Sequence, residues 1–222
     1  MSTVTTTSPA PPLARTLRVA GIAGILHGAL HIAWILLNQL VLMPSTEEGA
    51  LTTPAAMQDE FVMTTLVAVV FVAAGVLSIV SAGGVAALVR ARGSVLAPTA
   101  AALGASFGIV MIAVSAASAA IRGFPNEYIA ATGAPESTQA AVIEGMFAVP
   151  QSMTFLAALL FAAWCVVTAI ARVYPVWLLV VNVVVALVVT GLLFVAGAAG
   201  MMLSTIYFIV LGIWLVRAAR RA

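Results

Sequence analysis

Two histidines in the first long apolar segment are the residues of this chain best suited to chemistry. His27 and His31 are followed by Trp34 and Asn38 at intervals of four, three and four residues. On an α-helix this spacing places all four side chains on one face. An ionisable residue inside an apolar segment is costly to bury and marks a candidate functional site. We therefore expect this face to point towards protein and away from lipid.

The two histidines are compatible with several roles. Neutral imidazoles can hydrogen-bond neighbouring helices and hold them together, and they can also bind a ligand or take part in a proton step. A metal site would need further ligands, but no intramembrane carboxylate or thiolate cluster supplies them. Haem needs axial ligands from opposite faces, which two neighbours on one helix face cannot provide, and there is no third histidine. We predict no metal site and no cofactor, and leave packing and ligand binding open.

Two polar residues of other segments extend this candidate site. Gln151 should lie at the same depth as Asn38, roughly 8 Å below the external surface at 1.5 Å per residue. Arg122 requires an anionic partner, either a glutamate of the external loops or a lipid headgroup or anionic ligand. We predict an outward-opening pocket beneath the loop 122–145. The candidate ligand-binding residues are His27, His31, Asn38, Arg122 and Gln151.

The composition requires an apolar environment for these residues. Hydrophobic residues make up 64% of the chain and charged residues only 7%, against about 45–50% and about 25% in soluble domains. All nine basic residues are arginines, and no basic stripe exists that could neutralise a run of phosphates, which excludes nucleic acid as a partner. The single cysteine, Cys165, lies in an apolar run and cannot form an intramolecular disulfide.

Charge-free stretches predict an all-α membrane bundle of six transmembrane helices. The last stretch, 173–216, would be about 66 Å long as one helix, twice a hydrocarbon core of about 30 Å. We expect it to reverse at the small residues 196–200. A tail at 1–14 is predicted to be disordered and cytoplasmic, followed by a single domain at 15–222. The expected spans are 19–43, 61–89, 95–121, 146–171, 175–195 and 200–216.

The charges separate between the two sides of this arrangement. All arginines except Arg122 fall on one side, which the positive-inside bias makes cytoplasmic, so both termini are expected inside. These arginines are Arg15, Arg18, Arg90, Arg92, Arg172, Arg217, Arg220 and Arg221. The seven acids fall in the external loops, and they are Glu47, Glu48, Asp59, Glu60, Glu127, Glu136 and Glu144.

Small residues four positions apart should mediate the helix contacts. Gly24 with Gly28, and Gly104 with Gly108, would let backbones approach closely, and such faces could also support an oligomer. No glycine-rich phosphate loop, Ser-His-Asp set or Cys-x-x-Cys motif is found, so the familiar enzyme signatures are absent.

The C-terminal half carries a resemblance. The segment 174–178 (YPVWL), a glycine-containing reversal, and 213–216 (IWLV) before terminal arginines resemble a widespread bacterial multi-pass membrane family of unknown function. About 45 residues carry the resemblance. It implies a location in the plasma (inner) membrane and no known activity, and it transfers no functional residue.

Three functions fit these features. The first is the binding or movement of a small hydrophobic or lipid-like molecule. The second is a membrane enzyme acting on a lipid or isoprenoid, with His27 or His31 as acid or base. The third is a structural subunit of a membrane complex. An enzyme needs its titratable groups at one reacting centre, and the acids and histidines here are expected about 15 Å apart. The binding protein is therefore favoured.

Overall fold

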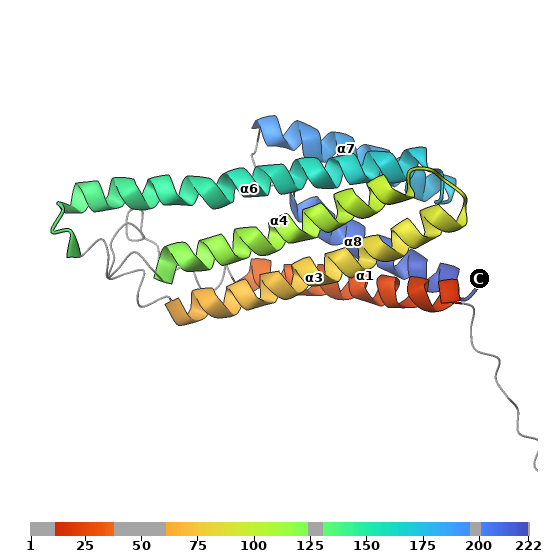
Figure 1. Ribbon diagram of the computed structural model, residues 1–222, viewed down its shortest axis with the longest axis horizontal. Coiled ribbons are helices and arrows are strands. Elements are labelled where there is room, and N and C mark those ends of the chain that lie inside the picture. The colour runs from red at the N-terminus through yellow and green to blue at the C-terminus, as the bar shows by residue number, and fades with distance from the viewer. Residues whose placement is uncertain (1–11, 38–60, 124–130, 196–200, 222) are drawn as a thin grey trace, which may run out of the picture.

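The computed structural model describes residues 12–37, 61–123, 131–195 and 201–221, and these residues form an all-helical bundle without strands (Figure 1). Each of its six helices is long and apolar enough to cross a membrane, which confirms the predicted fold class. The helices are α1 (Pro12–Leu37), α3 (Phe61–Ala91), α4 (Ala97–Gly123), α6 (Glu136–Ile170), α7 (Val176–Val195) and α8 (Met202–Ala219).

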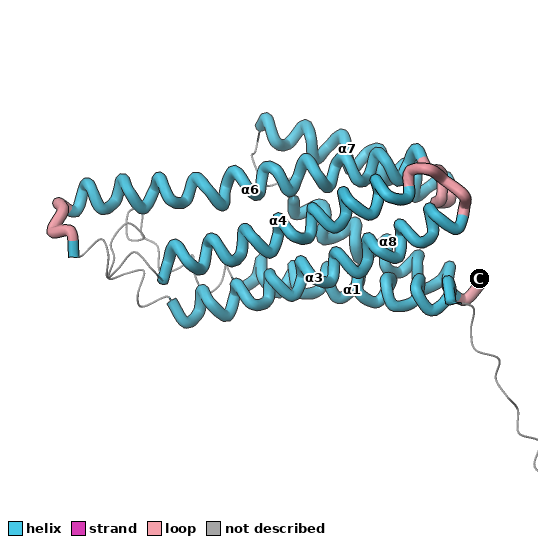
Figure 2. The backbone as a smooth tube through the Cα atoms, in the orientation of Figure 1, coloured by secondary structure: helices cyan, strands magenta, loops and turns pink. Residues whose placement is uncertain are grey.

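The two ends of the bundle differ in which segments they carry. The start of α1, the α3–α4 and α6–α7 turns and the end of α8 all lie at one end (Figures 1 and 2). This arrangement brings the arginine-bearing segments together, as the charge pattern predicted. The long apolar run 173–216 does divide into two helices, α7 and α8. The predicted reversal at 196–200 lies outside the described residues.

The first helix begins earlier than the expected span. α1 starts at Pro12, so residues 12–14 are helical, and Arg15 and Arg18 lie within its first two turns. Counting charge-free residues misses such turns, because arginines near a helix end can extend their charged heads to the interface. Proline is also well suited to the first helical position, where its missing N–H costs nothing. The rest of the predicted tail and the last part of the first span, 38–43, lie outside the described residues.

The fourth helix extends beyond the hydrocarbon thickness. α6 has 35 residues, or about 52 Å at 1.5 Å per residue, against a core of about 30 Å. Pro135 is the N-cap of this helix. The helix continues through Pro150, which has no N–H and therefore leaves the Met146 carbonyl without its usual helical partner.

Small residues bring the helices into backbone contact. α1 packs between α3 and α8. A Cβ atom added at Gly24 would lie 3.0 Å from the Phe208 carbonyl oxygen, and one at Gly108 would lie 2.8 Å from the Gly75 carbonyl oxygen. The predicted glycine contacts are therefore confirmed. The tightest approach on α8 had not been predicted: a Cβ atom at Gly212 would lie 2.5 Å from the carbonyl oxygen of Gly21.

An aromatic cluster occupies the centre of the bundle. Phe208 of α8 is completely buried, and its ring centroid lies 4.4 Å from that of His27. Four further rings have centroids within 5.9 Å of Phe208, and they belong to Phe107, Phe161, Trp164 and Tyr207. These rings come from α4, α6 and α8 itself. Together with His27, they bring the Phe208 side chain into contact with three other helices, α1, α4 and α6.

Candidate functional site

His27 holds α1 against α3. The side chain is 0% exposed, and its Nδ1 lies 2.7 Å from the carbonyl oxygen of Ala74. A carbonyl oxygen can only accept, so Nδ1 carries the hydrogen and donates it. In the neutral ring Nε2 is then an acceptor, and it is buried without a hydrogen-bond partner among the described residues. His27 acts here as a connection between two helices.

His31, one turn further along α1, makes the corresponding contact with α8. It is 3% exposed, and its Nδ1 lies 2.9 Å from Oγ1 of Thr205. Both histidines therefore face the bundle interior and bond a neighbouring helix, which confirms the prediction that they point away from lipid.

A cavity of about 370 Å³ lies beside His31. Its walls come from α1, α3, α4, α6 and the start of α8. They are mostly apolar and include Trp34, Phe71, Met111 and Phe147. Cavities that bind small molecules are usually about 300–1,000 Å³, with apolar walls and a few polar groups. Size and lining both fit that description.

The polar groups of this cavity are few and lie on three helices. The lining contains the imidazole of His31, the hydroxyls of Ser118 and Thr154 and the amide of Gln151. The Thr154 hydroxyl donates to the carbonyl oxygen of Pro150 at 2.8 Å and is therefore already engaged. Gln151 is exposed, so the cavity opens to the outside of the bundle there.

The structure brings only some of the predicted site residues together. His31 and Gln151 line the same cavity, and so does Trp34, one turn before Asn38. His27 is not among its lining residues, because it lies one turn deeper and is fully enclosed by packing. Asn38 lies outside the described residues. Arg122 belongs to the last turn of α4, but its side chain is not described, so its predicted convergence with Gln151 stays a prediction.

The sequence did not show which apolar residues would form the walls of this cavity. Phe71, Met111 and Phe147 are apolar residues in apolar helices, and no local pattern distinguishes a wall residue from one that packs or faces lipid. Pro150, which also lines the cavity, does carry a sequence signal, because a proline within a predicted helix indicates a local disturbance.

Other polar groups inside the bundle serve as contacts. Ser115 of α4 donates to the carbonyl oxygen of Ala68 on α3 at 2.8 Å. Asn182 of α7 donates through Nδ2 to Oγ1 of Thr168 on α6 at 3.2 Å. Such bonds between helices are a common means of holding membrane bundles together, and neither residue lines the cavity beside His31.

No protein-family model, no curated protein and no solved structure matches this chain. The case for a function therefore depends on the geometry of the cavity.

Proposed function

We propose that this protein binds, or helps to move, a small hydrophobic or lipid-like molecule in the cavity beside His31. The observation that carries the proposal is an apolar cavity of about 370 Å³ with His31 and Gln151 in its lining. Apolar walls suit a hydrocarbon or ring system, and the two polar side chains could orient a single polar group of the ligand.

The depth of the cavity supports a ligand drawn from the bilayer. His31 lies thirteen residues beyond Arg18 on α1, or about 20 Å along the helix axis. If Arg18 is at the membrane surface, the imidazole lies within the hydrocarbon core of about 30 Å. A molecule that occupies this cavity must be stable at that depth, which favours an amphiphile or an apolar compound over a charged metabolite.

The lining favours binding over acid–base catalysis. General acid–base chemistry on a lipid needs titratable groups within hydrogen-bond reach of one reacting centre. Among the described residues that line the cavity, His31 is the only titratable one, and its Nδ1 is already engaged by Thr205. A purely structural role would not explain the presence of the cavity. We therefore place the enzyme and the structural subunit behind the binding protein.

Filling the cavity is expected to reduce ligand retention strongly without unfolding the protein. Val114 of α4 is partly buried and lines the cavity, so in Val114→Phe the added ring should occupy free volume. Ile109 of the same helix is 57% exposed, and Ile109→Phe introduces the same ring outside the bundle. Native mass spectrometry of gently solubilised protein should show a bound hydrophobic molecule on the wild type and Ile109→Phe, and about tenfold less on Val114→Phe.

Thermal unfolding of the same samples separates binding from folding. Val114→Phe should keep the melting temperature of the ligand-stripped wild type. Equal ligand retention in all three proteins would show that the retained molecule lies elsewhere, and the proposed function would then lose its support.

We also propose that the protein lies in the plasma membrane. The end of the bundle that carries the α3–α4 and α6–α7 turns, which we call the arginine end, would lie in the cytoplasm. The resemblance of the C-terminal half supports this membrane, and the positive-inside bias supports this orientation. In a Cys165→Ala background, single cysteines at Ser137 and Glu48 should react with an impermeant maleimide added to intact cells. Cysteines at Arg92 and Ala219 should react only after permeabilisation. Labelling at position 92 in intact cells would exclude the proposed orientation.

A further inference from the structure

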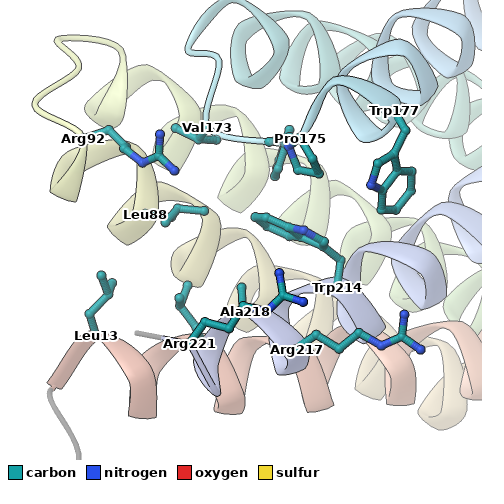
Figure 3. Close-up of a pocket in the computed structure, with 12 residues that line it drawn as sticks. Leu13, Leu88, Arg92, Val173, Pro175, Trp177, Trp214, Arg217, Ala218 and Arg221 are labelled. Carbon is teal, nitrogen blue, oxygen red and sulfur yellow. The ribbon is translucent and has the colours of Figure 1, made fainter.

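A second cavity, of about 570 Å³, lies at the arginine end of the bundle. Arg92, Arg217 and Arg221 are among its lining residues, and we call it the arginine pocket. Figure 3 shows the Trp214 ring in the middle of the pocket, with Arg92 on one side and Trp177 on the other. It does not share a lining residue with the cavity beside His31.

The three arginines reach this pocket from segments distant in the sequence. Arg92 follows the end of α3, Arg217 lies in the last turn of α8, and Arg221 follows that helix. All three are exposed. Three arginines in the lining of one hollow form a concentration of positive charge that suits an anion.

None of the described residues that line the pocket can neutralise this charge. The described lining of the pocket contains no carboxylate. Glu144, the acid closest in sequence to the α6–α7 turn, lies 26 residues before the end of α6, or about 39 Å along the helix. The α6–α7 turn provides Val173, Tyr174 and Pro175 to the pocket instead.

The remaining walls are apolar and aromatic. Leu17 and Leu88 are almost fully buried, and the Trp214 ring packs edge-on against Tyr174 with 5.3 Å between the centroids. Trp177, at the start of α7, is 51% exposed. Tryptophan and arginine at helix ends are typical of the level where lipid headgroups meet the acyl chains. The pocket therefore combines cationic groups with an apolar seat at that level.

We propose that the arginine pocket binds the phosphate headgroup of an anionic phospholipid in the leaflet at this end of the bundle. Arginine pairs with phosphate through two parallel hydrogen bonds, and basic pockets between transmembrane helices bind anionic headgroups. A free phosphate ion offers the same chemistry, but it would leave most of a cavity of this size and its apolar walls unused. The proposal does not depend on the function of the cavity beside His31.

The test compares two triple variants of the full-length chain. The first combines Arg92→Gln, Arg217→Gln and Arg221→Gln. The matched control combines Arg15→Gln, Arg18→Gln and Arg220→Gln, three exposed arginines of the same end that do not line the pocket. Each protein in neutral detergent is titrated with phosphatidylglycerol or phosphatidylcholine, and bound lipid is counted by native mass spectrometry. A parallel series contains millimolar inorganic phosphate as a competitor.

Wild type and the control triple should prefer phosphatidylglycerol, and the pocket triple should bind it roughly 100-fold more weakly. Phosphatidylcholine should bind weakly to all three, and inorganic phosphate should not displace the bound lipid. Equal losses in the two triples would mean that general surface charge attracts the lipid, and the pocket would be excluded. Arginine-dependent binding of inorganic phosphate without lipid would assign the pocket to a soluble anion and overturn the lipid proposal.

Discussion

Gly212→Leu is expected to separate α1 from α8 and to lower the stability of the bundle by about 3 kcal/mol, the upper part of the usual range for overpacking. For a chain of this size, that loss corresponds to a melting temperature about 6–12 °C lower. The reason is geometric: even a single Cβ atom at Gly212 would lie 2.5 Å from the carbonyl oxygen of Gly21 and 2.8 Å from the backbone nitrogen of Ile25. Backbone atoms cannot move aside as the end of a flexible side chain can, so the whole helix must shift.

A glycine on α7 provides the matched control. A Cβ atom at Gly191 would meet no heavy atom within 4 Å, and replacing a helical glycine normally favours the helix by about 1 kcal/mol or less. Gly191→Leu should therefore unfold at or above the wild-type temperature. If the two variants melted together, the close approach of α1 and α8 would be wrong.

Phe208→Ala is expected to cost about 3–5 kcal/mol, the usual range for a buried phenylalanine. In lipid there is little hydrophobic force between helices, so the cost comes mainly from lost ring contacts and from the cavity that remains. Phe208 is completely buried and meets the rings of five residues, which are His27, Phe107, Phe161, Trp164 and Tyr207. No single neighbouring side chain can fill a space bordered by so many helices.

Phe194→Ala removes the same ring from a position that is 83% exposed. We expect its melting temperature, measured in the same detergent, to stay within about 2 °C of the wild type, as for most surface substitutions. A large loss in Phe194→Ala, or none in Phe208→Ala, would contradict the central position assigned to the Phe208 ring.

The number of helices and the grouping of their ends could be predicted, because both follow from properties that are local in sequence. Charge-free length determines whether a segment can span, and the arginines mark which ends belong together. The inward orientation of His27 and His31 followed in the same way from residue type and helical spacing. These predictions require no knowledge of which helix lies beside which.

The site was predicted less completely, because it depends on which residues of different helices lie side by side. Nothing in the sequence indicates that Thr205, 174 residues away, is the partner of His31. His27 is enclosed by packing that includes the Phe208 ring, and its sequence position does not reveal these neighbours. The arginine pocket requires α3 and α8 to end near the α6–α7 turn. The sequence located its arginines on one side of the membrane but could not predict the hollow between them.

The pairing of the first helix with the last has a consequence for biogenesis. α1 leaves the ribosome before the other described helices, and Thr205, the partner of His31, is made 174 residues later. At roughly 5–20 residues per second, that interval lasts roughly 9–35 s. Throughout it, the Nδ1 of His31 lacks its native partner, although an unpaired polar group in hydrocarbon is costly. We therefore expect α1 to remain beside the insertion machinery until α8 is made, and a nascent chain cut before α8 to leave this histidine without its partner.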